Sequence, residues 1–258
     1  MKVVGIVPAY NEEHTITRVL DHVAQFSDAL IVVDDGSRDG TARQIAEWAR
    51  GRANVQVETL TQNRGVSTAL GCGFRIAVEW LRAGRLRPED LVFTIDADGQ
   101  HRPEYIPRIV EYMNARALDV VVTRRDFSIY PAHKKFGNAF LSWYGRHLSG
   151  FPYRDIESGF RFWRAWVVPQ FLAYYTGRRY SWAQEISIIT ARLGLKVDND
   201  FLAEVNYYRA GARARDGLNN VLLGLVAFLR VTFHLRSNVN AALAPFPAGS
   251  DAAYPPFE

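Results

Sequence analysis

The sequence has little of what marks secreted, membrane-spanning or repetitive proteins. Cys72 is its single cysteine, so an internal disulfide is excluded and a reducing compartment is expected. The most apolar stretch, residues 218–235, contains Asn219, Asn220 and Arg230 and falls short of the roughly 20 apolar residues that one membrane span needs. The chain enters a strand-like run at once, so we expect no signal peptide. We find no internal repeat. These absences favour a globular, cytoplasmic protein.

The composition is ordinary, and no charge of one sign dominates it. Hydrophobic residues make up 48% and charged residues 22% of 258 residues, enough for one large domain with a sizeable core. The net charge is +4 and the sequence pI is near 9.2. A mildly basic balance is compatible with anionic substrates or membrane surfaces, and we expect no nucleic-acid partner.

Strand-like runs and helical patterns alternate through the first half of the chain. We expect strands at residues 3–7, 29–33, 55–60, 91–95 and 119–123. We expect helices between them at residues 12–26, 40–50, 66–83 and 103–115. This alternation is typical of βαβ units and predicts an α/β fold with a mostly parallel sheet flanked by helices.

The second half is more basic and more aromatic, without a clear strand rhythm before residue 160. Helices are expected at residues 132–148, 164–175 and 182–193, and a strand at residues 200–207. We divide the chain into a main domain (1–215), an amphipathic helical segment (216–244) and a tail without fixed structure (245–258). The helix near 218–235 either packs on the domain or lies in a membrane interface, and the arginines around it favour contact with headgroups or phosphates.

Acidic residues follow three of the expected strands. Glu12 comes after the first strand, Asp35 after the second, and Asp96 and Asp98 after the fourth. In open α/β sheets, ligands bind outside the carboxyl ends of the strands. Three clusters at three such ends therefore indicate one common site.

Asp96, Asp98 and Gln100 are spaced by two, so an extended backbone would project them to one side. Two carboxylates and an amide oxygen can hold Mg²⁺ or Mn²⁺ and leave positions open for phosphate oxygens. Because Asp-x-Asp pairs are also common in surface turns, this motif gains its meaning from the neighbouring clusters.

Four motifs in order carry a resemblance to a known family. They are Val7-Pro8-Ala9-Tyr10-Asn11-Glu12-Glu13, Val32-Val33-Asp34-Asp35-Gly36-Ser37, Asn63-Arg64-Gly65 and Asp96-Ala97-Asp98-Gly99-Gln100-His101. Together they resemble family 2 glycosyltransferases of the GT-A fold. Asp155-Ile156-Glu157-Ser158-Gly159-Phe160-Arg161 and Trp182-Ala183-Gln184-Glu185-Ile186 are similar to motifs of its dolichol-phosphate mannose synthase and polyprenol-phosphate glycosyltransferase branch. The resemblance spans about residues 3–215.

The resemblance implies a GT-A (Rossmann-like) sheet with a helical, basic C-terminal extension. It implies metal-dependent, inverting transfer of a sugar from a GDP- or UDP-sugar to a polyprenyl phosphate, with peripheral contact at the inner face of the cell membrane. The implied ligands of the nucleotide-sugar are Pro8, Ala9, Tyr10, Glu12, Asp35 and Asp96. Asp96, Asp98 and Gln100 match metal positions, and Asp98 and Glu185 match catalytic ones. The implied phosphate and acceptor ligands are Arg124, Lys134, Lys135, Arg161, Arg209 and Arg213.

Two departures bear on the acceptor. The C-terminal loop reads Arg209-Ala210-Gly211-Ala212-Arg213-Ala214-Arg215 instead of the more usual Gly-x-Ser-Lys form, and the Lys134-Lys135 stretch also differs. The alternatives are a soluble glycosyltransferase with a hydroxyl acceptor and Glu185 as general base, or a non-catalytic adaptor that binds nucleotide-sugar or membrane. With a lipid phosphate, already anionic, Glu185 could equally be structural.

Overall fold

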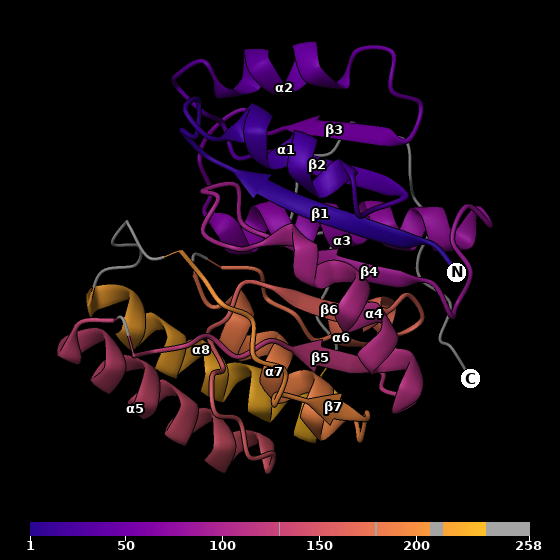
Figure 1. Cartoon of the computed structure of the whole chain (residues 1–258). Helices are drawn as coiled ribbons and strands as arrows, with labels where there is room; N and C mark the ends of the chain where they lie inside the picture. The colour runs from indigo at the N-terminus through magenta and orange to yellow at the C-terminus, as the bar shows by residue number, and fades with distance from the viewer. Residues whose placement is uncertain (129, 179, 207–213, 236–258) are drawn as a thin grey trace.

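The computed structural model describes residues 1–128, 130–178, 180–206 and 214–235, with the side chains of residues 133, 134 and 214–219 left aside. Its centre is a seven-stranded sheet of order β3-β2-β1-β4-β6-β5-β7 (Figure 1). The strands are β1 (Val3–Ala9), β2 (Ala29–Asp34), β3 (Val55–Thr59), β4 (Leu91–Thr94), β5 (Val120–Val122), β6 (Arg161–Arg164) and β7 (Val197–Asp198). The predicted, mostly parallel sheet is confirmed.

Helices cover both faces of this sheet (Figure 1). They are α1 (Ile16–Ala24), α2 (Thr41–Ala49), α3 (Val66–Arg82), η1 (Pro103–Tyr105), α4 (Ile106–Ala115), α5 (Ala132–Ser149), α6 (Val167–Leu172), α7 (Trp182–Arg192) and α8 (Ala214–Thr232). All seven residues of β1 are buried. Alternate side chains enter different cores: Val4 and Ile6 join the cluster with α3, α6 and α7, whereas Val3 and Val7 join the one with α1, α2 and α4.

Two strands, β6 and β7, were not predicted. Arg161–Arg164 forms β6, which runs antiparallel between β4 and β5, with Phe162 opposite Phe93 and Val121. The expected helix at 164–175 therefore begins only at Val167. Phe162 and Trp163 favour strands, but four residues with arginine at both ends are too few to predict one, and the two long-range pairings make this segment a strand.

The expected strand at residues 200–207 was wrong for its described part, residues 200–206. Only single-residue bridges occur there, from Leu202 to Arg124 and from Val205 to His101. The two-residue β7 lies just before it and closes the sheet beside β5.

The C-terminal helix α8 lies beside α5, along the lower edge of Figure 1, and both pack against α7. Tyr144 of α5 donates a 2.8 Å hydrogen bond to the carbonyl of Val221 in α8. Ala227 and Val231 are buried in the core cluster that includes α7. Of the two readings of this segment, packing on the domain is therefore realised in the structure. Residues 236–244 and the predicted tail lie outside the described residues.

Candidate active site

The site lies where the strand order reverses. From β1 the chain builds the sheet outward through β2 to β3 and then returns to place β4 on the other side of β1. Both β2 and β4 pair with β1 in parallel, so the loops after all three strands emerge at one edge. Such a switch point is where open α/β sheets bind ligands. These are the loops that the sequence predicts to form one site, and the strand order brings them to one edge of the sheet.

The loop after β1 begins later than we predicted. Pro8 and Ala9 are buried strand residues, paired with Val33 and Asp34 of β2. Tyr10 is the first residue with an exposed side chain, at 37%. Glu12 is half-buried, and its backbone N–H donates to the Thr41 hydroxyl at 2.8 Å. Of the four residues predicted here, only Tyr10 and Glu12 offer side-chain surface to a ligand.

Asp35 anchors the neighbouring loop. Its backbone N–H donates to the carbonyl of Ala9, which ties it to the end of β1. Its carboxylate accepts hydrogen bonds from the Asn63 amide at 2.9 Å and from the N–H groups of Arg64 and Gly65 at 2.8 and 2.7 Å. Burial raises the pKa of this carboxyl, while the two backbone hydrogen bonds oppose the rise. Asp35 thus organises the rim of the site, and its predicted contact with the nucleotide stays a prediction.

Asp96 and Asp98 follow β4. Burial raises the pKa of Asp98, and the nearby charge of Asp96 raises it further. Burial alone would also raise the pKa of Asp96, but a hydrogen bond from His101 and the charges of His101 and Arg125 bring it below its ordinary value. Gln100 donates to Asp98 through its backbone N–H at 2.9 Å and its side-chain amide at 2.6 Å. The three predicted metal residues therefore form one short loop.

His101, which was not among the predicted site residues, is a partner of Asp96. Its Nε2 lies 3.4 Å from Asp96 Oδ2, and its side chain is only 6% exposed. The ring packs 5.5 Å from the ring of Phe160, and the backbone of His101 is bridged to Val205. His101 thereby holds the Asp96 carboxylate from one side.

The donor set suits a hard divalent ion. Two adjacent carboxylates repel each other, and a cation between them would relieve the repulsion seen in the raised pKa of Asp98. Among the described residues no group of three His, Cys, Asp or Glu side chains converges. An ion here would therefore take its remaining ligands from Gln100, water or phosphate oxygens, as Mg²⁺ commonly does.

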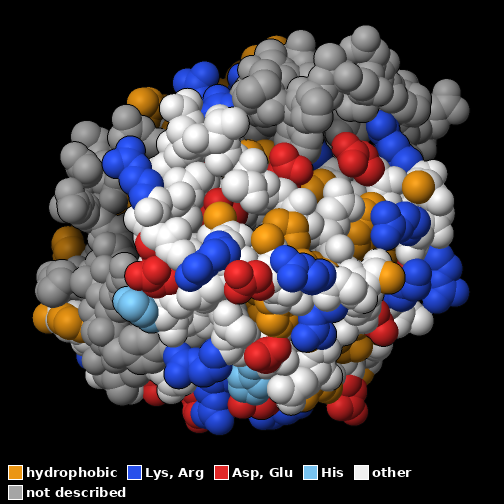
Figure 2. Space-filling model, turned by 90° about the horizontal axis from the view of Figure 1, so that it is seen from above, with side chains coloured by type: hydrophobic (Ala, Val, Ile, Leu, Met, Phe, Trp, Pro, Cys, Tyr) orange, Lys and Arg blue, Asp and Glu red, His pale blue; other side chains and the backbone are white. Residues whose placement is uncertain are grey.

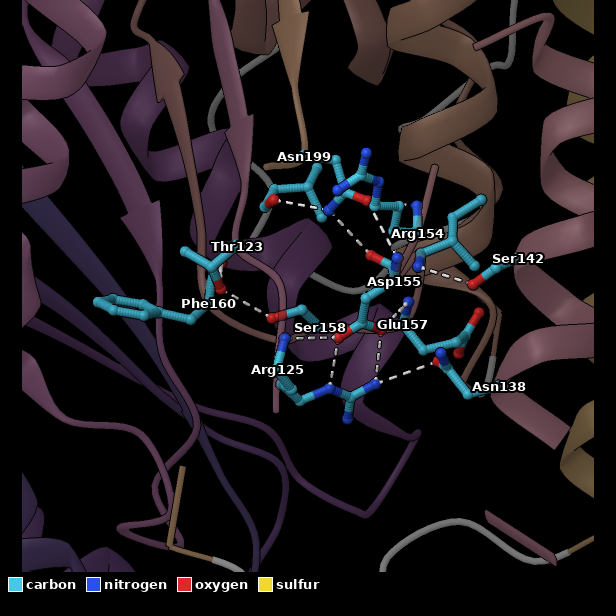
Figure 3. Close-up of polar contacts among 12 residues, drawn as sticks. Thr123, Arg125, Asn138, Ser142, Arg154, Asp155, Glu157, Ser158, Phe160 and Asn199 are labelled. Atoms are coloured by element: carbon cyan, nitrogen blue, oxygen red, sulfur yellow. Dashed lines mark hydrogen bonds and ion pairs between the residues drawn. The ribbon is translucent and has the colours of Figure 1, made fainter. Parts of the chain in front are cut away.

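A buried polar network joins the end of β5 to the segment that leads into β6 (Figure 3). Arg125 forms an ion pair with Asp155, whose side chain is fully buried. Asn199 accepts hydrogen bonds from the N–H groups of Arg154 and Asp155. The hydroxyls of Thr123 and Ser158 share a hydrogen bond of 2.9 Å. The motif at 155–161 therefore acts first as a fixed scaffold.

The six predicted phosphate and acceptor residues differ in where they lie. Arg124 follows β5, and its buried Nε finds no acceptor in the described part of the chain. Lys135 is exposed and donates to the Ser128 carbonyl at 3.1 Å. Arg209 and Arg213 lie outside the described residues, and so does the side chain of Lys134.

Arg161 departs from its predicted role. Its guanidinium is fully buried and donates to the carbonyls of Ser158 and Ala183 and to the Ser187 hydroxyl. It also lies 4.7 Å from the Trp182 ring centroid. Because it offers no surface to a phosphate, we do not keep it as an acceptor ligand.

Glu185 is also buried. Its carboxylate accepts hydrogen bonds from the backbone N–H and hydroxyl of Thr176 at 2.8 and 2.7 Å, and from the Ser181 hydroxyl. Burial raises its pKa, and these hydrogen bonds oppose the rise. Both partners belong to the segment between α6 and α7, so in this structure the carboxylate organises that segment.

A sheet with acidic loops on both sides of its switch point, one of them carrying Asp-x-Asp, is the arrangement that the predicted GT-A fold leads us to expect. The chain belongs to glycosyl transferase family 2, whose family model matches residues 6–187.

Similar proteins agree with this membership. The undecaprenyl-phosphate mannosyltransferase of Micrococcus luteus is 33% identical over 76% of this chain and 81% of its own length. The UDP-N-acetylglucosamine–dolichyl-phosphate N-acetylglucosaminyltransferase of Methanococcus voltae is 30% identical over 88% of this chain and 93% of its own. Both names describe polyprenol-phosphate glycosyltransferases, the branch that the motifs resemble.

A solved structure has the same fold. Glucosyl-3-phosphoglycerate synthase from Mycobacterium tuberculosis, in complex with Mn²⁺, UDP and glucosyl-3-phosphoglycerate, aligns with a TM-score of 0.59 at 19% identity. The alignment covers 89% of this chain and 78% of that one. At this identity the likeness speaks for the fold alone.

Proposed function

We propose that the protein transfers a sugar from a nucleotide-sugar to a polyprenyl-phosphate-type lipid, with inversion at the anomeric carbon, in the presence of Mg²⁺ or Mn²⁺. The observation that carries the proposal is the meeting of the loops after β1, β2 and β4 at the switch point, with Asp96 and Asp98 in the loop after β4. The names of the relatives support the lipid acceptor, and the UDP-N-acetylglucosamine in the name of the Methanococcus voltae relative supports a nucleotide-sugar donor.

On the donor side, Asp96 and Asp98 would hold the ion, which supplies positive charge that stabilises the departing diphosphate. Tyr10 offers an exposed ring to the nucleotide, and Asp35 keeps the 63–65 loop in place beside it. His101 keeps Asp96 oriented. The contribution of the chain is thus to position the donor and to fix the carboxylates in advance.

On the acceptor side, a lipid phosphate needs positive charge more than it needs a base. Arg124 has a buried Nε without an acceptor among the described residues, which suits an anionic oxygen. The buried, fully bonded Glu185 fits this chemistry, because a phosphate that is already anionic requires no general base.

The outer face of α5 and α8 supports contact with a membrane surface. Phe136, Phe140 and Trp143 recur along one side of α5 and are exposed, Phe136 at 77%. The exposed apolar residues of α8 recur in the same way: Leu222, Leu225 and Leu229. No helix in the described part of the chain is long and apolar enough to cross a bilayer. An amphipathic helix binds a membrane interface by burying its apolar face there, and α5 and α8 lie side by side.

The opposite side of the molecule has a different character. Figure 2 views it from above, the side on which α2 lies in Figure 1, and acidic and basic side chains are interspersed over it. Moving a surface of mixed charge into an apolar phase is unfavourable, because its charged side chains would lose their hydration. We therefore assign membrane contact to the face formed by α5 and α8.

The test is a transfer assay with purified protein. UDP- and GDP-sugars would be screened with Mn²⁺ or Mg²⁺ against a short polyprenyl phosphate and against soluble sugar alcohols. We expect transfer to the lipid phosphate only with metal, and at least a hundredfold loss in Asp98→Asn. Transfer to hydroxyl acceptors alone would favour the soluble glycosyltransferase instead. Donor binding without any transfer would favour the adaptor.

A further inference from the structure

Gly159 lies directly against the carboxylate of Asp96. A Cβ built on Gly159 would stand 2.3 Å from Asp96 Oδ2, 3.0 Å from its Cγ and 3.1 Å from its Oδ1. All three carboxylate atoms therefore face the hydrogen that a side chain would replace. Gly159 is not among the glycines with positive φ, so its backbone does not demand glycine. The requirement comes from the space that Asp96 occupies.

The backbone of Gly159 cannot easily move away. Its carbonyl accepts a 2.8 Å hydrogen bond from the Thr94 hydroxyl at the end of β4. On either side, Ser158 bonds to Thr123 at 2.9 Å, and the Phe160 carbonyl accepts from the Thr123 hydroxyl at 2.8 Å. These bonds are buried and come from Thr94 at the end of β4 and Thr123 just after β5, the two strands on either side of β6, and Figure 3 shows the Thr123 end of the arrangement. Gly159 is thus a fixed wall.

Asp96 has a second close neighbour, which contacts the same carboxylate oxygen that lies nearest to Gly159. His101 lies 3.4 Å from Oδ2, and its ring is packed against Phe160, the residue after Gly159. A carboxylate whose Oδ2 is contacted both by a fixed backbone and by a buried ring has little freedom to turn. Its position is set before any ligand arrives.

We infer that Gly159 is a positioning residue for the divalent ion: its missing side chain lets Asp96 adopt the orientation in which it serves as a ligand. The inference rests on the proposed function, which makes Asp96 a metal ligand. It gives the Ser-Gly pair of the 155–161 segment a role in the donor half of the site, although this segment follows Asp96 by some sixty residues.

The test is a double-mutant cycle on the full chain, measured by Mn²⁺ binding and by thermal unfolding without metal. Gly159→Ala should weaken Mn²⁺ binding at least tenfold and lower the melting temperature by several degrees. The matched control is Gly137→Ala, because nothing among the described residues lies within 4 Å of a Cβ there. In an Asp96→Ala background, adding Gly159→Ala should lower the melting temperature hardly any further, because the carboxylate atoms that the new methyl group would contact are absent.

The outcomes separate this inference from the function on which it rests. If Asp96→Ala binds Mn²⁺ like the unmodified protein, the metal assignment fails. If Asp96→Ala abolishes binding while Gly159→Ala keeps it, the positioning role fails and the metal assignment stands. If Gly159→Ala does not fold, recovery of folding in the double variant supports the inference, and continued failure to fold overturns it.

Discussion

The guanidinium of Arg125 binds the carboxylate of Asp155 with two hydrogen bonds of 2.8 Å, from Nε to Oδ2 and from Nη2 to Oδ1. The backbone N–H of Arg125 adds a third at 3.0 Å. This pair joins the end of β5 to the segment that leads into β6. It therefore holds in place the segment 155–161, in which Gly159 contacts Asp96.

Removing one partner of this pair should be costly. Asp155→Ala leaves a largely buried guanidinium without its counter-charge, and we expect a loss of about 3–5 kcal/mol in the free energy of unfolding. Urea denaturation measures it. Asp200→Ala is the control, because the Arg154–Asp200 pair is more than half exposed and should contribute less than about 1 kcal/mol. Equal losses in the two variants would contradict a special role for the buried pair.

Glu157 should make stability depend on pH. Burial raises its pKa to about 7, above the ordinary carboxyl value that it regains on unfolding. The folded state therefore binds the extra proton, so stability is greatest below the unfolded pKa and falls as the pH rises through about 7. Relative to Glu157→Gln, the protein should lose about 1–3 kcal/mol between pH 5 and 8. Parallel urea titrations at these pH values measure this, and identical pH profiles would refute it.

Glu185 should matter for stability more than for turnover. Glu185→Gln keeps the shape but weakens the hydrogen bonds from Thr176 and Ser181, so the melting temperature should fall. With a lipid-phosphate acceptor, the turnover of the folded variant should change only a few-fold. A loss of about 10²–10⁴-fold would instead identify a general base. Steady-state kinetics below the melting temperature distinguish the two.

Cys72 should resist alkylation in the folded protein. It is fully buried, and burial raises the pKa of its thiol to about 11. Only about a thousandth of it is then thiolate at pH 8, and that fraction is inaccessible. Mass spectrometry after iodoacetamide treatment should find Cys72 unmodified in buffer and fully modified in urea. Rapid reaction in buffer would mean that α3 opens readily.

Membrane contact should depend on the face formed by α5 and α8. The double variant Phe140→Ser/Leu225→Ser removes one exposed apolar side chain from each helix. Binding to vesicles containing phosphatidylglycerol should weaken at least about tenfold, because each buried apolar side chain contributes about 1.5–3 kcal/mol. Leu202→Ser is the control, since Leu202 is also exposed at 45% but lies outside both helices. Co-sedimentation measures binding, and an equal loss in the control would remove the assignment.

Most helices and parallel strands were predictable because local pattern encodes them. The apolar runs that became β1, β2 and β4 and the helical periodicity of α3 are properties of consecutive residues. The short, antiparallel β6 and the bridges of Leu202 and Val205 were not, since they exist only through partners far along the chain.

The positions of the candidate site's acidic residues were predictable, and its geometry was less so. Asp35, Asp96 and Asp98 stand at strand ends, as their sequence context indicates. Burial, which the sequence does not show, decided which of the other predicted residues can reach a ligand. Arg161 and Arg124 look alike in the sequence, yet the guanidinium of Arg161 donates its hydrogen bonds to backbone carbonyls. The contact of Gly159 with Asp96 has no local signature, because it joins a glycine without unusual φ to a residue from another strand.

The sequence by itself determined which residues could carry the chemistry, because an apolar run followed directly by carboxylates is a local pattern that consecutive residues display. Only the tertiary structure decided which of them meet. The placement of β4 on the far side of β1 made three loops into one site, and the insertion of β6 set Gly159 against Asp96. Strand order and close packing depend on long-range pairing, which no stretch of local sequence specifies alone.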